Sequence, residues 1–413
     1  MSITWFVRLV RANVSLRGAS RVLELLFAAG GLADHAPDWT TGRLWLQRLG
    51  HAKLTQPLPQ ADDWAWLIDH SVQIGQEKCL VILGIRLCDL PSRGVSLRHE
   101  QMELVELLPR TSWTKQEVAA ALEAATARTG VPRVIVDDHG ADLTGGADLF
   151  RAQHPQTSEI YDAKHKAACV LKRRLGHDPR WAAFQTQVGR TRCAIQQTEL
   201  AFLVPPGARP KSLFMNLEPL LRWATHVLSI LAAPPDVVLK HSTPERLAEK
   251  LGWLEEYRDA VGEWASWQAV VDLVVKFVNL HGHFADAAAE LRSQLPSNPI
   301  QASTRELSEE LLAFVSAESA KAKTGERLPG STEVLESCFG RFKVLEKDQS
   351  RGGFTSLLLS FGALLSDTTV ETIQSALAHS HTQDVWTWCR EKLGTTVFAK
   401  RQLAFKSGVT KPG

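Results

Sequence analysis

The spacing of hydrophobic positions changes along the chain, and its first stretch has the period of an α-helix. Residues 15–26 place apolar side chains on one helical face, and residues 38–54 repeat the pattern, with Thr40 or Thr41 as the expected N-cap. Two short helices in this order fit a helix-turn-helix whose second helix enters a DNA major groove, and a plain helical hairpin is the alternative. The side chains expected to contact DNA from the second helix are Thr41, Arg43, Gln47 and Arg48.

From residue 64 the pattern changes to short apolar runs typical of β-strands. Residues 64–74 and 79–87 form two such runs around a short connection, as in a β-hairpin. Residues 114–130 are expected to form a helix, because Thr114 and Glu117 make a capping box. The further elements are strands at 102–109, 132–138 and 157–163, a short helix at 145–155 and a basic amphipathic helix at 164–175. The order β-β-β-α-β-α-β-α is that of a ribonuclease H-like fold, in which an antiparallel hairpin joins a parallel βαβ portion.

Strand patterns nearly vanish between residues 176 and 325, where well-capped helices follow one another. Tryptophans at helical spacing are expected to lie in the core of this segment, namely Trp223, Trp253, Trp264 and Trp267. The paired histidines there, His281 and His283, lack metal-ligand spacing and are expected at the surface. Residues 331–347 form another helix, and its buried face is predicted to consist of Leu335, Cys338, Phe342 and Leu345.

These patterns predict an α/β ribonuclease H-like catalytic core that is interrupted by an all-α insertion and preceded by a small helix-turn-helix domain. The expected segments are the helix-turn-helix at 1–58, the first part of the core at 59–175, the α-helical insertion at 176–325, the last part of the core at 326–380 and a basic C-terminal tail at 381–413.

Composition limits the class of protein without identifying it. The 413 residues are 44% hydrophobic and 22% charged, as in ordinary globular proteins of two or three domains. No apolar run is long enough to suggest a membrane span, and arginines interrupt the N-terminus where a secretory signal would be apolar. Six cysteines without a CxxC pair indicate reduced core residues in a cytoplasmic protein. Although the net charge is only +2, basic residues concentrate in 1–58, 164–192 and 386–413, which favours phosphate binding there.

Two carboxylates occupy positions where burial is costly. Asp69 lies within an apolar strand, and Asp138 ends the apolar run 132–138, which should form a neighbouring parallel strand. In a ribonuclease H-like sheet these positions lie side by side, and the repulsion between them is removed by Mg²⁺. Asp137 is the alternative to Asp138, since adjacent strand residues point to opposite faces and only one of them should reach the metal.

The third carboxylate is expected on the helix at 331–347. Glu336 shares a helical face with Gly340, Lys343 and Lys347, away from the apolar stripe. A carboxylate that binds metal and lysines that bind phosphate would therefore lie on one surface. Glu333 is the alternative, although its place in the first turn is explained by the helix dipole alone. Asp162 and His165 could support the site from outside it, or could be a helix cap and a surface histidine.

Three sequence stretches resemble DDE-type transposases of bacterial insertion sequences. They are WLIDHSVQIGQEKCLVILGI around Asp69, VIVDDHGADL around Asp138 and EVLESCFGRFK around Glu336. The last is similar to the family's E-x-x-F-x-R/K helix, and Asp138-His139-Gly140 matches its D-x-G pattern. Many relatives carry an inserted domain between the second aspartate and the glutamate, which fits the helical segment here.

The resemblance implies a transposase that binds transposon ends and performs metal-dependent DNA cleavage and strand transfer. Two Mg²⁺ ions, with Mn²⁺ as an alternative, would be held by Asp69, Asp138 and Glu336. The partners would be double-stranded DNA, as terminal inverted repeats and target, and further copies of the chain in a homodimer or higher oligomer. DNA-backbone contacts are expected from Lys164, Lys166, Lys172, Arg173, Arg174, Lys343 and Lys347. A ribonuclease H-like nuclease without strand transfer and an inactive DNA-binding protein derived from a transposase are the alternatives.

Overall fold

The computed structural model describes residues 2–31, 36–72, 78–90, 95–207, 214–215, 217–296, 301–347, 354–395 and 397–406. The connection of the predicted hairpin at 73–77, the predicted glycine-rich turn at 348–353 and the end of the basic tail lie outside these residues. Internal contacts divide the chain into two compact units, which are described separately. Unit 1 comprises residues 1–160 and 331–413, and unit 2 comprises residues 161–330.

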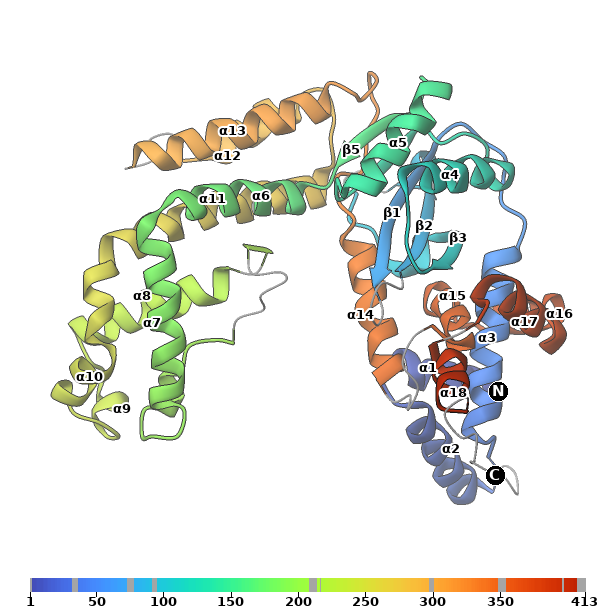
Figure 1. Ribbon diagram of the computed structural model, residues 1–413, viewed down its shortest axis with the longest axis horizontal. Helices are drawn as coiled ribbons and strands as arrows, with labels where there is room; N and C mark the ends of the chain where they lie inside the picture. The colour runs from blue at the N-terminus through green and yellow to red at the C-terminus, as the bar shows by residue number, and fades with distance from the viewer. Residues whose placement is uncertain are drawn as a thin grey trace, which may run out of the picture. The chain divides into compact units, whose positions relative to one another are not determined.

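Unit 1 is built on a five-stranded mixed sheet with the strand order β3-β2-β1-β4-β5 (Figure 1). Strand β1 pairs with β2 in antiparallel and with β4 in parallel orientation, and β2 pairs with β3 in antiparallel orientation. The strands are β1 (Trp64–Val72), β2 (Lys78–Arg86), β3 (Glu103–Arg110), β4 (Val134–Asp137) and β5 (Ser158–Tyr161). The predicted strands are therefore confirmed, with small shifts at their ends.

Helices α4 (Lys115–Thr129) and α5 (Ala141–Gln153) cover one face of the sheet. Trp66, Ile68 and Ile135 belong to one buried cluster with Val118 of α4 and Phe150 of α5. The capping box predicted at the start of α4 is present, because the Thr114 side chain accepts from the Glu117 N–H and the Glu117 side chain accepts from the Thr114 N–H. This layer takes the even-numbered residues of β1, as the alternation of side chains along a strand requires.

Helices α14 (Glu333–Lys347) and α15 (Ser360–Leu365) cover the other face. Leu104 of β3 lies against Gly362 of α15. Leu104 pairs with Leu83 of β2, and Leu83 pairs with Leu67 of β1. Since directly paired residues point to the same side, Leu67 faces this layer, and Asp69, two residues further along β1, faces it too.

The two N-terminal helices predicted from the sequence are present as α2 (Leu16–Gly30) and α3 (Trp39–Thr55), and α1 (Ser2–Arg11) precedes them. The N-cap of α3 is Asp38, whose carboxylate accepts from the Thr40 N–H at 2.8 Å, so the predicted cap at Thr40 or Thr41 is wrong. Helix α3 packs against α1, α2, β3, α15 and two late helices, α16 (Val370–His379) and α17 (Thr382–Trp388). The predicted pair of helices is thus part of a larger helical layer.

The prediction that Gln47 and Arg48 lie on an exposed face of α3 is wrong. Gln47 is 3% exposed, and its side-chain amide donates to Ser356 Oγ at 2.9 Å. The Arg48 guanidinium donates to the carbonyl oxygens of Leu377 and Ser380 at 2.6 and 2.8 Å. These partners lie more than 300 residues later in the chain, so the local sequence pattern could not reveal them.

Unit 2 is helical throughout its described residues apart from turns, one isolated bridge and the end of β5. Its helices are α6 (Ala163–His177), α7 (Pro179–Ile195), α8 (Glu218–Ala232), α9 (Asp236–Leu239), α10 (Pro244–Leu251), α11 (Arg258–His281), α12 (Ala287–Gln294) and α13 (Ala302–Ser319). The expected helical segment began at residue 176, whereas α6 contacts α7 and α11 and therefore belongs to this unit.

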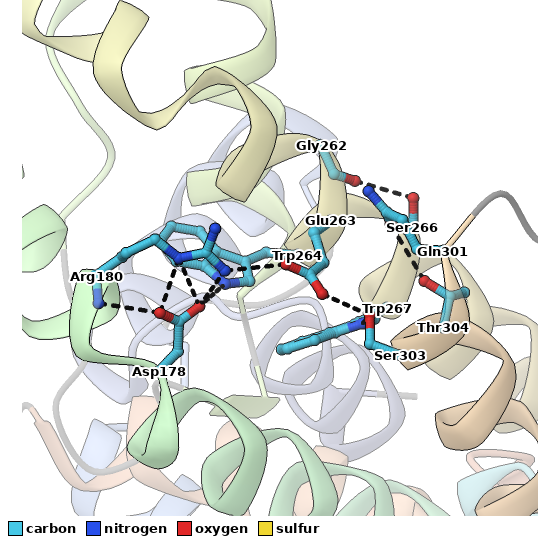
Figure 2. Close-up of polar contacts among 10 residues, drawn as sticks. All are labelled: Asp178, Arg180, Gly262, Glu263, Trp264, Ser266, Trp267, Gln301, Ser303 and Thr304. Atoms are coloured by element: carbon cyan, nitrogen blue, oxygen red, sulfur yellow. Dashed lines mark hydrogen bonds and ion pairs between the residues drawn. The ribbon is translucent and has the colours of Figure 1, made fainter.

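The tryptophans predicted in the core of unit 2 pack there. Trp264 is fully buried and Trp267 is 5% exposed, while Trp223 and Trp253 pack against the same cluster from partly buried positions. Figure 2 shows how the two buried indoles satisfy their N–H groups: Trp264 donates to Asp178 at 3.0 Å, and Trp267 donates to Ser303 at 3.3 Å. Both indoles are thereby held in place by polar partners as well as by apolar contact.

The prediction of a surface position for His283 is wrong. Its side chain is fully buried in unit 2, with Nδ1 at 3.3 Å from Ser319 Oγ, and burial lowers its pKa to about 3. Among the cysteines, Cys79 and Cys338 are buried as expected, whereas Cys88, Cys169 and Cys193 are exposed, and all six are free thiols. Within the described residues, no helix is both long enough and apolar enough to span a bilayer.

Substitution of Gly50 tests the packing of α3. A Cβ at residue 50 would lie 1.6 Å from the Leu359 carbonyl oxygen, so Gly50→Ala is expected to lower the free energy of unfolding by about 1–3 kcal/mol or more. Gly340→Ala in α14 is the control, because a Cβ there meets nothing within 4 Å, and it should be neutral or stabilising by up to about 1 kcal/mol. Denaturant unfolding of both variants measures the difference, and equal effects would contradict the close approach.

Candidate functional site

The parallel register brings the first two predicted carboxylates to the same end of the sheet. Leu67 of β1 is paired with Val136 of β4, so continuing the register two residues places Asp69 opposite Asp138. Asp69 is half-buried, and its Oδ1 accepts from the His70 N–H at 2.6 Å. Asp138 is also half-buried and follows the last residue of β4, where its Oδ1 accepts from the Gly140 N–H at 2.8 Å. The continued register thus predicts that the two carboxylates are neighbours.

Helix α14, which carries the third predicted carboxylate, lies beside β1 (Figure 1). The predicted apolar stripe is confirmed, because Leu335, Cys338, Phe342 and Leu345 are all buried. Glu336 is half-buried on the flank of this stripe, and Glu333 is exposed at the start of the helix. Gly340, Lys343 and Lys347 are exposed, so the acidic and basic positions share the accessible side of α14 as predicted. Convergence of Glu336 with Asp69 and Asp138 on one metal site stays a prediction.

His70, directly after Asp69, is a polar neighbour that the sequence reading did not single out. Its side chain is 7% exposed, and its Nδ1 lies 3.6 Å from Asp142 Oδ2, which also accepts from Lys78 Nζ at 3.2 Å. Burial lowers the pKa of His70 to about 4, against the opposing attraction of Asp142. His70 is therefore neutral at pH 7 and adds no positive charge beside the carboxylates.

A second acidic group lies at the ends of β4 and β5, and we call Asp137, His139 and Glu159 the β4–β5 group. One ligand atom from each residue lies within 4.8 Å of the others, so the group could hold a metal ion. Asp137 is fully buried, and its Oδ1 accepts from the His139 N–H at 2.7 Å. His139 Nε2 lies 3.5 Å from Glu159 Oε1, and Glu159 Oε2 accepts from Arg151 at 2.9 Å.

From the sequence, Asp137 is only an alternative to Asp138, and the pattern does not predict His139 and Glu159 as its partners. The signal was weak, because Glu159 lies in a strand of four residues whose pairing partner cannot be read from a local pattern. In the structure the two aspartates have different surroundings: Asp137 is fully buried, and Asp138 is half-buried. Burial and the nearby charge of Glu159 raise the pKa of Asp137 to about 8.

The basic residues of α6 that are predicted to contact DNA differ in their exposure and in their ion pairs. Arg173 and Arg174 form ion pairs with Glu310 of α13 at 2.5 and 3.3 Å, and Lys166 lies over the rings of Tyr161 and Phe314. Lys164 is half-buried and Lys172 is exposed. The arginines are thus partly neutralised within unit 2. Asp162 caps α6 by accepting from the His165 N–H at 2.8 Å, which accounts for this carboxylate as a helix cap.

Two further predicted DNA contacts lie at the start of α3. Thr41 is exposed, and Arg43 is half-buried with its guanidinium over the ring of Trp39 at 5.7 Å. Arg17 of α2 lies over the same ring at 5.1 Å. Of the four residues predicted on this helix, Thr41 and Arg43 therefore keep an accessible position, while Gln47 and Arg48 hold the C-terminal helices.

Comparison with known proteins gives no family for this chain. No protein-family model matches the sequence, and no curated protein matches it. The function is therefore inferred from the arrangement of residues in the structure.

The raised pKa of Asp137 predicts a pH-dependent loss of stability in the presence of a chelator. Because the folded-state pKa lies above the ordinary value of 3.8, the contribution of this carboxyl to stability is fully present below pH 3.8 and is lost as pH rises through about 8. Asp137→Asn should flatten this part of the curve. Denaturant unfolding between pH 5 and 9 measures it, with the exposed Asp148→Asn as control, and an unchanged slope in Asp137→Asn would refute the assignment.

Proposed function

We propose that unit 1 is a ribonuclease H-like catalytic core and that the protein is a DNA transposase, which cleaves DNA and joins the freed 3′-hydroxyl to a target strand. The observation that supports the proposal is the pairing of Leu67 with Val136, because this register, continued by two residues, would bring Asp69 opposite Asp138 on the sheet side covered by α14. The strand order β3-β2-β1-β4-β5, with three antiparallel strands followed by β4 parallel to β1, supports the same fold.

The donor set fits divalent metal ions of the magnesium type. Asp69, Asp138 and Glu336 offer carboxylate oxygens, the ligands that Mg²⁺ prefers, and two adjacent carboxylates repel each other without a counter-charge. Mg²⁺, or Mn²⁺ in its place, would supply activation of the attacking oxygen and stabilisation of the leaving oxygen. Neutral His70 adds no positive charge that would oppose binding of a cation.

The contribution of the chain beyond the carboxylates is to position the DNA backbone. A pocket of about 250 Å³ next to α14 is lined by Arg11, Asn13, Ser15, Arg341 and Lys347, among others. Arg11 already bonds to Glu100 and to the Ser366 carbonyl, so Arg341 and Lys347 are the cations left for phosphate. Exposed Lys343 extends this basic surface along the helix. Phosphate contacts of this kind fix the strand without reading its sequence.

Recognition of transposon ends is proposed for the exposed start of α3 and the neighbouring face of α2. Hydrogen-bond donors are provided there by Thr41, Arg43 and Arg17. Gln47 and Arg48 are not proposed to contact DNA, because their side chains bond to the C-terminal part of the chain. Lys164 and Lys172 of unit 2 remain proposed backbone contacts. The protein would act on DNA as a homodimer or higher oligomer, since two transposon ends must be held together for joining.

Glu336→Gln separates catalysis from DNA binding. The variant should lower Mg²⁺-dependent cleavage by at least about 100-fold, because an amide replaces a carboxylate ligand, while its affinity for duplex ends taken from the DNA that flanks the gene should stay within a factor of about 2. Gel-based cleavage and strand-transfer assays with a 3′-hydroxyl substrate provide the measurement. Glu333→Gln is the matched control on the same helix, and full cleavage by Glu336→Gln would defeat the proposal. Cleavage without joining would point to a nuclease.

Removal of positive charge at the α14 pocket tests the phosphate contacts. Arg341→Ala and Lys347→Ala should each weaken binding to any duplex sequence and reduce the salt slope of log K by about 1, because one counterion-releasing contact is lost. Lys115→Ala, an exposed lysine on α4 at the opposite face of the sheet, should leave the slope unchanged. Fluorescence anisotropy at several salt concentrations measures the slopes, and equal slopes for all three variants would exclude this pocket.

A further inference from the structure

The β4–β5 group combines three features of a metal site in a small volume. Asp137 comes from the end of β4, His139 from the following turn and Glu159 from β5, and one ligand atom of each lies within 4.8 Å of the others. Asp137 and Glu159 are 0% and 5% exposed, so two carboxylates approach each other where water screens them little. The group belongs to unit 1 alone and does not include any of the three carboxylates proposed for catalysis.

One buried oxygen of this group is unsatisfied. Asp137 Oδ1 accepts from the His139 N–H, but Asp137 Oδ2 is buried and has no hydrogen-bond partner among the described residues. Leaving a buried carboxylate oxygen without a donor or a cation is costly, and native structures rarely do so without a reason. This oxygen is the observation, beyond the acidic cluster itself, that indicates a ligand.

The charges of the surrounding residues favour a cation. Arg151 donates to Glu159 at 2.9 Å and shares its guanidinium with Asp148 at 3.3 Å, so its single positive charge is divided between two acidic residues. A cation bound here would add to the positive charge that Arg151 divides between Glu159 and Asp148. The His139 side chain is 36% exposed, which leaves the group open to solvent on one side and gives an ion a way in.

We propose that the β4–β5 group binds one divalent transition-metal ion of the Zn²⁺ or Mn²⁺ type. One imidazole nitrogen with carboxylate oxygens is the donor set that such ions accept, whereas Mg²⁺ prefers oxygen alone. Arg151 would hold Glu159 in its ligating orientation from outside the site. The ion would also fix the residue between its first two ligands, Asp138, and so would hold the end of β4 in position.

Zinc titration of the full chain tests the proposal. Protein purified with a chelator, dialysed and supplied with millimolar Mg²⁺ is titrated with Zn²⁺ by calorimetry, and wild type should take up one equivalent. His139→Ala should weaken this binding by at least about 10-fold. Because His139 is at the surface, this variant should retain its fold, which circular dichroism checks; Asp137→Asn provides a second variant with the same expected loss.

The Glu336→Gln variant is the control that separates this site from the catalytic one. It should bind one Zn²⁺ equivalent as wild type does, and Zn²⁺ should raise the melting temperature of both but not of His139→Ala. Absence of a bound equivalent in wild type, or equal affinity in His139→Ala, would overturn the proposal and would leave the two buried carboxyls sharing a proton. If Glu336→Gln loses Mg²⁺-dependent cleavage but still binds zinc, the zinc site at the β4–β5 group is supported independently of the catalytic carboxylates. The two proposals are therefore tested by different measurements.

Discussion

The parallel pairing of β1 with β4 is the constraint on which the rest of unit 1 depends. Ala65, Trp66 and Leu67 pair with Val134, Ile135 and Val136, and all six side chains are buried. This short apolar ladder fixes the register, since a slip of one residue would turn every side chain to the opposite face. Continued by two residues, the same register would bring Asp69 opposite Asp138, just beyond the end of β4. The helices on the two faces then decide what each carboxylate meets.

Asp137 is the last residue of β4 and Asp138 follows it, and the two aspartates have different surroundings. Asp137 follows Ile135 by two residues and therefore points to the α4–α5 layer, where Glu159 and Arg151 lie. By the same alternation Asp138 is expected on the side that α14 covers, opposite Asp69. The sequence offers Asp137 and Asp138 as alternatives for one site, and we propose a different role for each of them. One aspartate belongs to a buried group with a histidine, and the other to the proposed catalytic carboxylates.

Features set by neighbouring residues could be predicted from the sequence. The capping box of α4, the apolar face of α14 and the strands of the sheet each depend on side chains a few positions apart. Features set by distant partners could not. Gln47 and Arg48 have the spacing of exposed residues, but the C-terminal helices cover them, and His283 is buried by packing within unit 2. His139 and Glu159 become partners only when β5 lies next to β4, which no local pattern reveals.

Anomalous diffraction from crystals grown with Mn²⁺ tests the central claim most directly, because it locates the ions and their ligands at once. We expect two manganese peaks about 3.5–4 Å apart, coordinated by Asp69, Asp138 and Glu336. A further peak at Asp137, His139 and Glu159 would mark the proposed second metal site and would not bear on the catalytic one. Manganese bound elsewhere, with Glu336 turned away from the two aspartates and coordinating nothing, would contradict the account and remove the basis for a DNA-cleaving enzyme.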